Sequence, residues 1–291
     1  RRAASTPPTV KASTTISAHP VAKVGSARMT RPATQNSGSV ESGAAGTREG
    51  TPLRFDNGLG GVTAEGDYLV RVRGDCVPPA PWVNVIANAR GGFIVSERGA
   101  GCTWAENSQS YRLTPWHNDP VSDPATEVLY LRDVESGESW SATPAPMGRL
   151  APYTVLHGAG SSSFEQEQSG IATHLTLGIA HDAPIKLSLL RVTNRGTRAR
   201  RIAVTAYAEW AIGGLREHTQ HQVVTSFSAD AGAIYARNFF DPQFASWVAF
   251  CATSEPLTSY TADRREFIGR NGTTSDPAGL RQPLAGTTRA G

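Results

Sequence analysis

The sequence predicts an all-β fold, a large antiparallel two-sheet sandwich, and three observations support this prediction. From about residue 53 onward, short runs rich in β-branched and aromatic residues alternate with turns built from Gly, Pro and Asn. Several runs alternate apolar and polar side chains with a period of two, which puts successive side chains on opposite faces of a strand. No segment sustains a helical stripe over about a dozen residues, so we expect helices to contribute little.

The candidate strands follow one another at short intervals. In chain order they are 68–73, 82–88, 92–97, 128–133, 153–158, 171–180, 185–194, 201–210, 222–229, 233–238 and 246–251. The run 201–210 alternates most clearly, with Ile202 and Val204 on one face and Ala203 and Thr205 on the other. Roughly a dozen strands are too many for a small immunoglobulin-like module and fit a large sandwich better.

The first fifty residues differ in composition from the rest. They hold Ala, Ser, Thr, Pro and Gly with scattered basic residues and few large apolar side chains. Such a segment buries too little surface to offset its ordering entropy. We predict a disordered leader or linker over 1–50, a sandwich domain over 51–275 and the start of a truncated linker over 276–291. Because the chain begins with arginine rather than methionine, we interpret it as a piece of a longer protein.

Charge and cysteine usage restrict the classes of partner and the redox compartment that we expect for this chain. The formal net charge is +3, but six basic residues precede the first acid, Glu41, and the chain without them is slightly acidic. We therefore expect no nucleic-acid partner. Three widely spaced cysteines argue against a disulfide framework and fit a reducing compartment. No apolar run approaches the roughly 18 residues that span a bilayer, so we expect no membrane contact.

The segment 103–120, TWAENSQSYRLTPWHNDP, is the densest part of the chain in aromatic, charged and amide side chains. Sugars present apolar C–H faces and a rim of hydroxyls, which proteins hold with aromatic rings and with amide, acid and arginine groups. Pro115 and Pro120 stiffen the segment and lower its ordering cost. We predict sugar-binding residues at Trp104, Glu106, Asn107, Arg112, Trp116, Asn118 and Asp119, and Tyr111 offers a further ring.

An architectural role explains the same composition. The tryptophans would then plug the edge of the sandwich core, while the Asn and Asp side chains would form turns. Composition alone favours neither interpretation, so both stay open at this point.

We assign no catalytic residue to the chain. Glu165 and Glu167 lie two apart, as paired carboxylates on one strand face can, but two exposed strand glutamates are the commoner case. A mutarotase acting alone would need an acid–base pair, for which Glu165 with His157 or His174 is the only arrangement to consider. No GxSxG nucleophile motif and no glycine-rich phosphate loop occurs.

We also expect no metal site. His218 and His221 are three residues apart and would share one face of a helix. Apart from Glu217, no cysteine or acid stands nearby at ligand spacing, so we interpret this stretch as an exposed polar turn.

Eight motifs follow one another in an order typical of a known family. They are FDNGLGGVTAEGDYLVRV, PAPWVNVIAN, GFIVSERGAGCTWAENS, LTPWHNDPVSDP, LYLRDVESGESWS, the HGAG and FEQEQSGI pair, VTAYAEW and ARNFF. Together they resemble the N-terminal part of the glycoside hydrolase family 94 (glycosyltransferase family 36) module of cyclic β-1,2-glucan synthases, which is related to cellobiose and chitobiose phosphorylases. The resemblance covers about residues 53–275.

The resemblance implies a β-supersandwich of the galactose-mutarotase-like kind. In the family a helical linker and an (α/α)6 barrel follow it, and the barrel holds the general acid and the phosphate-binding residues. This chain would then be the carbohydrate-binding or structural N-terminal domain of a phosphorylase-type glycosyltransferase module acting on β-1,2-glucan, inactive by itself. The alternative is a stand-alone carbohydrate-binding or interdomain packing module without a role in catalysis.

The resemblance also implies partners and a location. We expect a β-glucan oligosaccharide, the barrel of the same parent chain and a second copy in a homodimer as partners. No cofactor is expected here; inorganic phosphate would be the co-substrate of the full-length module, and UDP-glucose would serve only a separate transferase module. The expected location is the cytoplasmic side of an inner-membrane protein of a Gram-negative bacterium.

Overall fold

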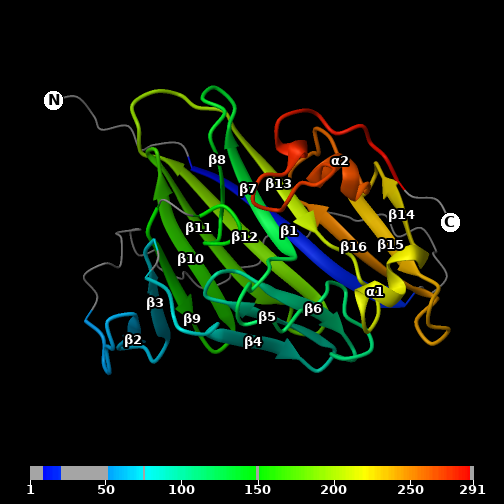
Figure 1. Ribbon diagram of the computed structural model, residues 1–291, viewed down its shortest axis with the longest axis horizontal. Coiled ribbons are helices and arrows are strands. Elements are labelled where there is room, and N and C mark those ends of the chain that lie inside the picture. The colour runs from blue at the N-terminus through cyan, green and yellow to red at the C-terminus, as the bar shows by residue number, and fades with distance from the viewer. Residues whose placement is uncertain (1–8, 21–51, 75, 149–150, 289–291) are drawn as a thin grey trace, which may run out of the picture.

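The computed structural model describes residues 9–20, 52–74, 76–148 and 151–288. The described residues form three β-sheets, and every pairing between their neighbouring strands is antiparallel (Figure 1). Each of the eleven segments predicted from the sequence contains a strand. Five strands of the described residues were not among them. Strands β2 (Gly60–Val62), β6 (Gly101–Ala105) and β8 (Ser139–Ser141) are three to five residues long and rich in Gly or Ser, which gives little periodic signal. Strand β10 (Ser161–Gln168) has the sequence SSSFEQEQ, with one large apolar residue, and strand β1 (Thr9–Pro20) lies in the segment predicted to be disordered.

The largest sheet has ten strands, built from both ends of the described chain. Its order is β14 (Val223–Ser228), β15 (Ala233–Asn238), β16 (Trp247–Thr253), β1 (Thr9–Pro20), β12 (Ile185–Asn194), β11 (Ile171–Ile179), β10 (Ser161–Gln168), β9 (Tyr153–His157), β3 (Tyr68–Val72) and β2 (Gly60–Val62).

Two three-stranded sheets lie over one face of the large sheet (Figure 1). One has the order β4 (Val83–Asn88), β5 (Gly91–Ser96) and β6 (Gly101–Ala105); the other has the order β13 (Ile202–Ala208), β7 (Glu127–Asp133) and β8 (Ser139–Ser141). The main core lies between the layers and includes Val155, Phe164 and Leu190 from the large sheet with Phe93 and Leu131 from the small ones. The predicted sandwich is therefore confirmed, with its second layer divided in two.

The helices of the described residues are few and short. They are α1 (Arg216–Thr219) and α2 (Arg264–Ile268), with 3-10 turns η2 (Gln220–Gln222) and η3 (Ala278–Leu280). Within the described ranges, none of them has the length and apolar character needed to cross a bilayer. Residues 276–288, predicted to begin a linker, pack on the domain through Leu280 and Leu284, which contact the apolar cluster around Phe267.

The N-terminal segment differs from the sequence expectation in one stretch. Residues 9–20 form strand β1, which pairs with β12 on one side and β16 on the other, where a disordered segment was predicted. Its sequence TVKASTTISAHP holds five β-branched residues, and two neighbouring strands supply its backbone hydrogen-bond partners. The rest of the predicted leader, residues 1–8 and 21–50, lies outside the described residues.

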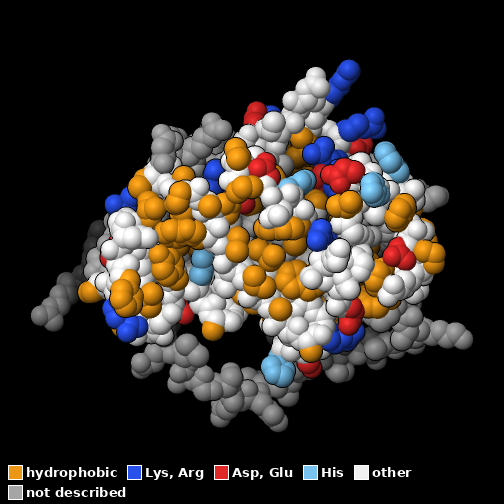
Figure 2. Space-filling view, turned by 60° about the horizontal axis from the view of Figure 1, so that its bottom comes forward, with side chains coloured by type: hydrophobic (Ala, Val, Ile, Leu, Met, Phe, Trp, Pro, Cys, Tyr) orange, Lys and Arg blue, Asp and Glu red, His pale blue; other side chains and the backbone are white. Residues whose placement is uncertain are grey.

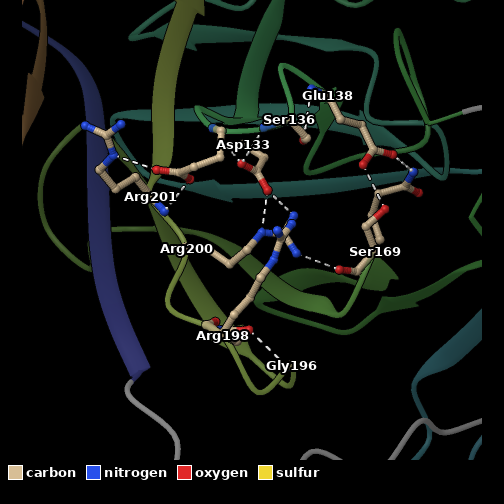
Figure 3. A network of polar contacts seen from close by, with 11 residues as sticks. Asp133, Ser136, Glu138, Ser169, Gly196, Arg198, Arg200 and Arg201 are labelled. Carbon is tan, nitrogen blue, oxygen red and sulfur yellow. Dashed lines mark hydrogen bonds and ion pairs between the residues drawn. The ribbon is translucent and has the colours of Figure 1, made fainter.

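A buried polar network fastens the β7–β8 turn to the large sheet (Figure 3). The carboxylate of Asp133 is fully buried; it accepts backbone N–H groups of its own turn and is paired with the guanidinium of Arg200. Arg200 Nη1 also donates to the carbonyl of Ser169, in the β10–β11 turn, at 2.9 Å. Burial acts to raise the pKa of Asp133, but the Ser136 N–H and Arg200 outweigh it, and the net direction is down.

Candidate functional site

The segment that follows β6 first folds back on its own strand. The Asn107 side chain accepts the N–H groups of Gln109 and Ser110, each at 2.9 Å, and so forms a tight turn. The chain then returns beside β6, where Leu113 N donates to Thr103 O at 2.8 Å. This return carries the segment across the end of the small sheet and out to the surface.

Tyr111 anchors the returning segment and is not available to a sugar. Its ring is fully buried and packs against Phe244 and Trp247, with ring centroids 4.5 and 5.2 Å apart. The sequence offered Tyr111 as a ring for a sugar face, and the structure corrects this. This aromatic residue of a polar segment packs in the core, where burial stabilises the fold by roughly 25 cal/mol per Å² of apolar area.

Beyond this anchor, the segment Trp116–Pro124 borders an open cavity of about 250 Å³. The lining residues are Ala80, Pro81, Val83, Ala100, Gly101, Trp116, His117, Asn118, Asp119, Pro120, Asp123 and Pro124. The cavity approaches the lower end of small-molecule sites, which run to roughly 300 Å³ and above. One ring, one amide, one imidazole and two carboxyls therefore face one hollow together with apolar walls.

Backbone geometry explains why Asn and Asp stand where they do in this segment. Asn118 and Asp123 have φ values of +49° and +39°, a left-handed conformation that Asn and Asp tolerate better than other non-glycine residues. Asp119 closes the turn between them: its carboxylate accepts Val121 N–H at 3.0 Å and the Ser122 hydroxyl, and Asp123 N donates to Asp119 O at 3.0 Å.

The two aspartates of this turn have opposite electrostatic environments. The Ser122 hydroxyl, and then the Val121 N–H, lower the pKa of Asp119. Burial raises the pKa of Asp123, although the Ser96 hydroxyl, which donates to Asp123 Oδ2 at 2.7 Å, opposes this. Neighbouring carboxyls with diverging pKa values are common where a protein handles polar ligands.

A third carboxyl lies behind the cavity wall. Glu97 is 2% exposed and its Oε2 accepts the N–H of Trp82 at 2.7 Å, between the lining residues Pro81 and Val83. Burial raises the pKa of Glu97 to about 7, with the Trp82 hydrogen bond acting against the rise.

The structure divides the seven predicted site residues into two groups. Trp116, Asn118 and Asp119 line the cavity. Trp104, Glu106, Asn107 and Arg112 do not, and three of these four are engaged within their own region. Glu106 pairs with Arg90 at 2.8 Å, the Asn107 amide forms its turn, and Arg112 donates to the carbonyls of Ser108 and Gly214.

Trp104 belongs to the outer face of the small sheet. Its ring lies on Gly92, where an added Cβ would stand 2.5 Å from the indole Cζ2 atom. On β4, Val83 and Val85 are also exposed on this side, while Asn84 and Ile86 turn inward. Figure 2 turns the lower edge of Figure 1, where β4 lies, toward the viewer and shows hydrophobic side chains gathered across the middle of that view.

A second polar cluster is buried between the layers, away from the predicted residues. Lys186 Nζ lies 2.6 Å from Glu127 Oε2, and the hydroxyls of Thr103 and Thr114 donate to the other carboxylate oxygen. Burial acts to raise the pKa of Glu127, but Lys186 and the hydroxyls outweigh it, so the net direction is down. The adjoining cavity of about 40 Å³ has room for little more than a water molecule.

Of the acid–base pairings considered from the sequence, the structure forms one. Glu165 and His174 are cross-strand partners on β10 and β11, with Nδ1 and Oε1 3.3 Å apart. His157 instead bonds with the Ser162 hydroxyl and the Trp82 carbonyl. Glu165 and Glu167 share a strand face, as expected, while the intervening Gln166 is buried.

Comparison with known proteins adds to this geometry. The family described as glycosyl hydrolase 94, supersandwich domain, matches residues 66–291. The chain belongs to this family. The matched residues contain every strand of the three sheets except β1 and β2, and the family-94 resemblance seen in the motifs is confirmed.

Three known proteins are similar to this chain over most of its length. The cyclic beta-(1,2)-glucan synthase NdvB of Rhizobium meliloti (strain 1021) is 37% identical over 226 residues, which is 77% of this chain and 8% of NdvB. Solabiose phosphorylase of Paenibacillus borealis is 28% identical over 77% of this chain and 30% of its own length. N,N'-diacetylchitobiose phosphorylase of Vibrio proteolyticus is 23% identical over 70% and 26%. The chain therefore spans less than a third of each of these relatives.

Proposed function

We propose that this supersandwich borders the sugar site of a phosphorylase-type glycosyltransferase acting on β-linked glucan. The observation that carries the proposal is the cavity of about 250 Å³ at which Trp116, Asn118 and Asp119 meet. The indole supplies an apolar surface for a sugar C–H face, and the amide and carboxylate accept or donate hydrogen bonds at the hydroxyl rim. The names of the relatives, a cyclic β-1,2-glucan synthase and two disaccharide phosphorylases, agree with a sugar ligand.

The domain's part in such a reaction is to position the substrate. The described residues hold the cavity groups in a turn fixed by Asp119 and by two left-handed positions, so the groups are ordered before a sugar arrives. In the whole protein, inorganic phosphate would attack the anomeric carbon while an acid of a separate helical barrel protonates the leaving oxygen. The barrel, a homodimer partner and a location on the cytoplasmic side of an inner membrane belong to this proposal.

Sugar titration of the 291-residue chain tests the proposal. We expect β-1,2-linked glucooligosaccharides to shift the Trp116 indole resonance with millimolar affinity, because the cavity is one side of a larger site. In Trp116→Ala, the sugar should no longer cause most of the resonance shifts seen at the other cavity residues. Asn118→Ala should weaken sugar binding about tenfold, as expected for a lost hydrogen bond of roughly 1.4 kcal/mol. Glu106→Gln, outside the cavity, is the matched control and should bind like the wild type.

An interdomain packing role is the second candidate, and the exposed valines of β4 favour it. Val83 lines the cavity and is 46% exposed, and Val85 is 57% exposed, so the cavity borders an apolar surface. If Trp116→Ala and Asn118→Ala leave sugar titration unchanged but lower the free energy of unfolding, packing replaces sugar contact as the role of this segment. Micromolar sugar affinity of the chain alone would instead indicate a stand-alone carbohydrate-binding module.

A further inference from the structure

Of the two carboxyls that line the cavity, Asp123 is the buried one, and one of its two oxygens accepts a hydrogen bond from the protein. It is 8% exposed and lines the cavity together with Trp116 and Asn118. Its Oδ2 accepts the Ser96 hydroxyl at 2.7 Å. Within the part of the chain that the structure describes, no hydrogen bond or ion pair reaches the other oxygen, Oδ1. Oδ1 is not among the fully buried side-chain atoms of the described residues that lack a partner, so it is open to the cavity, where a ligand hydroxyl can donate to it.

The surroundings hold this carboxyl in one orientation. Ser96 lies at the end of β5, and its oxygen in turn accepts the backbone N–H groups of Arg98 and Ala100, each at 3.2 Å. The backbone of Asp123 is fixed by the hydrogen bond from its N–H to Asp119 O. The side chain is thus positioned by a rigid strand end and a closed turn, which is the arrangement that binding groups need.

We propose that Asp123 is the hydroxyl-binding carboxylate of this cavity and accepts hydrogen bonds from a sugar diol whose apolar face lies on Trp116. The inference rests on the proposed function, since it names a further residue of the same sugar site. Asp119 contributes less, because each of its oxygens already accepts one hydrogen bond of its own turn, from the Val121 N–H and the Ser122 hydroxyl, whereas Asp123 Oδ1 has no protein donor among the described residues. Sugar hydroxyls donate well to an ionised carboxylate, so the interaction requires Asp123 to be deprotonated.

The site should therefore bind sugar more tightly as pH rises. The titratable and charged groups that face Asp123 are Asp119 and His117 in its own loop, and Glu97 and Arg98 after β5. Burial raises the pKa of Asp123, Asp119 adds to the rise and Arg98 opposes it. Protonation would remove the acceptor at low pH, and affinity would recover as pH passes through the raised pKa.

Sugar titrations with Asp123→Asn test the inference. Asparagine keeps the shape and tolerates the left-handed backbone, so we expect a folded variant that binds β-1,2-linked glucooligosaccharides about tenfold more weakly at pH 8. Between about pH 4.5 and about pH 8, the affinity of the wild type should rise, and that of Asp123→Asn should stay flat. His117→Gln controls for the neighbouring imidazole and should keep the rise. Ser96→Ala, which frees Oδ2 from its anchor, should weaken binding with a smaller effect.

The outcomes separate the two proposals. If the wild type binds no sugar at any pH, the proposed function and the inference both fail. If Trp116→Ala weakens binding while Asp123→Asn matches the wild type in affinity and pH profile, the sugar site stands and the role of Asp123 is refuted. A rise with pH that persists in Asp123→Asn but disappears in His117→Gln would likewise assign the effect to the imidazole and overturn the inference.

Discussion

Replacing Glu97 by glutamine should stabilise the domain at neutral and alkaline pH. Burial raises the pKa of this carboxyl from its ordinary value of 4.5 to about 7, so the folded protein prefers the neutral acid. The stabilisation from the neutral acid is fully present below about pH 4.5 and is lost as pH rises through about 7. Glutamine is neutral at every pH, and its side-chain oxygen can accept the Trp82 N–H as Glu97 Oε2 does.

The size of the effect follows from the pKa. A rise from 4.5 to about 7 corresponds to about 3 kcal/mol, at about 1.4 kcal/mol for each pH unit. The free energy of unfolding of Glu97→Gln should exceed that of the wild type by almost nothing near about pH 4.5. The difference should grow to about 3 kcal/mol above pH 7, which is a large part of the stability of a typical domain.

Urea unfolding followed by tryptophan fluorescence measures this difference across the pH range. Taking the difference between the two proteins cancels all groups that titrate alike in both. Glu135→Gln is the control: its pKa is lowered by the hydrogen bonds from Arg201, so its effect should have the opposite sign and not change between about pH 6 and about pH 8. A Glu97→Gln curve parallel to the wild type, or a wild type more stable than the variant at pH 8, would refute the reasoning.

Two further predictions concern the interior. Lys186→Met should lower the free energy of unfolding by about 3–5 kcal/mol at neutral pH, because it leaves the Glu127 carboxylate buried without its cation. Adding Glu127→Gln should restore most of this loss. Additive effects of the two substitutions in a double-mutant cycle would contradict the prediction. Gly101→Ala should prevent stable folding, since its added Cβ would lie 1.9 Å from the carbonyl oxygen of Ile94 and its φ is +153°. Gly160→Ala, where the space is open, is the matched control, and equal urea midpoints for the two alanine variants would contradict the steric explanation.

The sequence predicted the fold because the strand signal is local. Alternation with a period of two and frequent turn residues placed eleven strands, and the order of the family motifs supplied the supersandwich. The alternation cannot say which face of a strand is buried. On β12, Leu187 and Leu189 are exposed while Lys186 and Ser188 lie inside, because Glu127 on the opposing layer supplies the lysine with a partner.

The same limit applies to the N-terminal segment. Composition predicted disorder for residues 9–20, but the fate of this segment depends on β12 and β16, two strands far away in the chain. Local composition does not show whether distant strands will supply a segment with backbone hydrogen-bond partners.

For the candidate site, the sequence by itself determined the chemistry: rings, amides and acids gathered in residues 103–120 beside stiffening prolines. Only the tertiary structure decided how they are used. In the structure Tyr111 is buried in the core, and the side chains of Asn107 and Arg112 form hydrogen bonds within their own region. Trp116 lines the cavity together with Asp123, a residue that was not predicted from the sequence. The second Asp-Pro pair of NDPVSDP was the available signal. The physical reason is that residue type fixes what a side chain can bind, whereas its neighbours in space fix whether those atoms are already satisfied or still face a cavity.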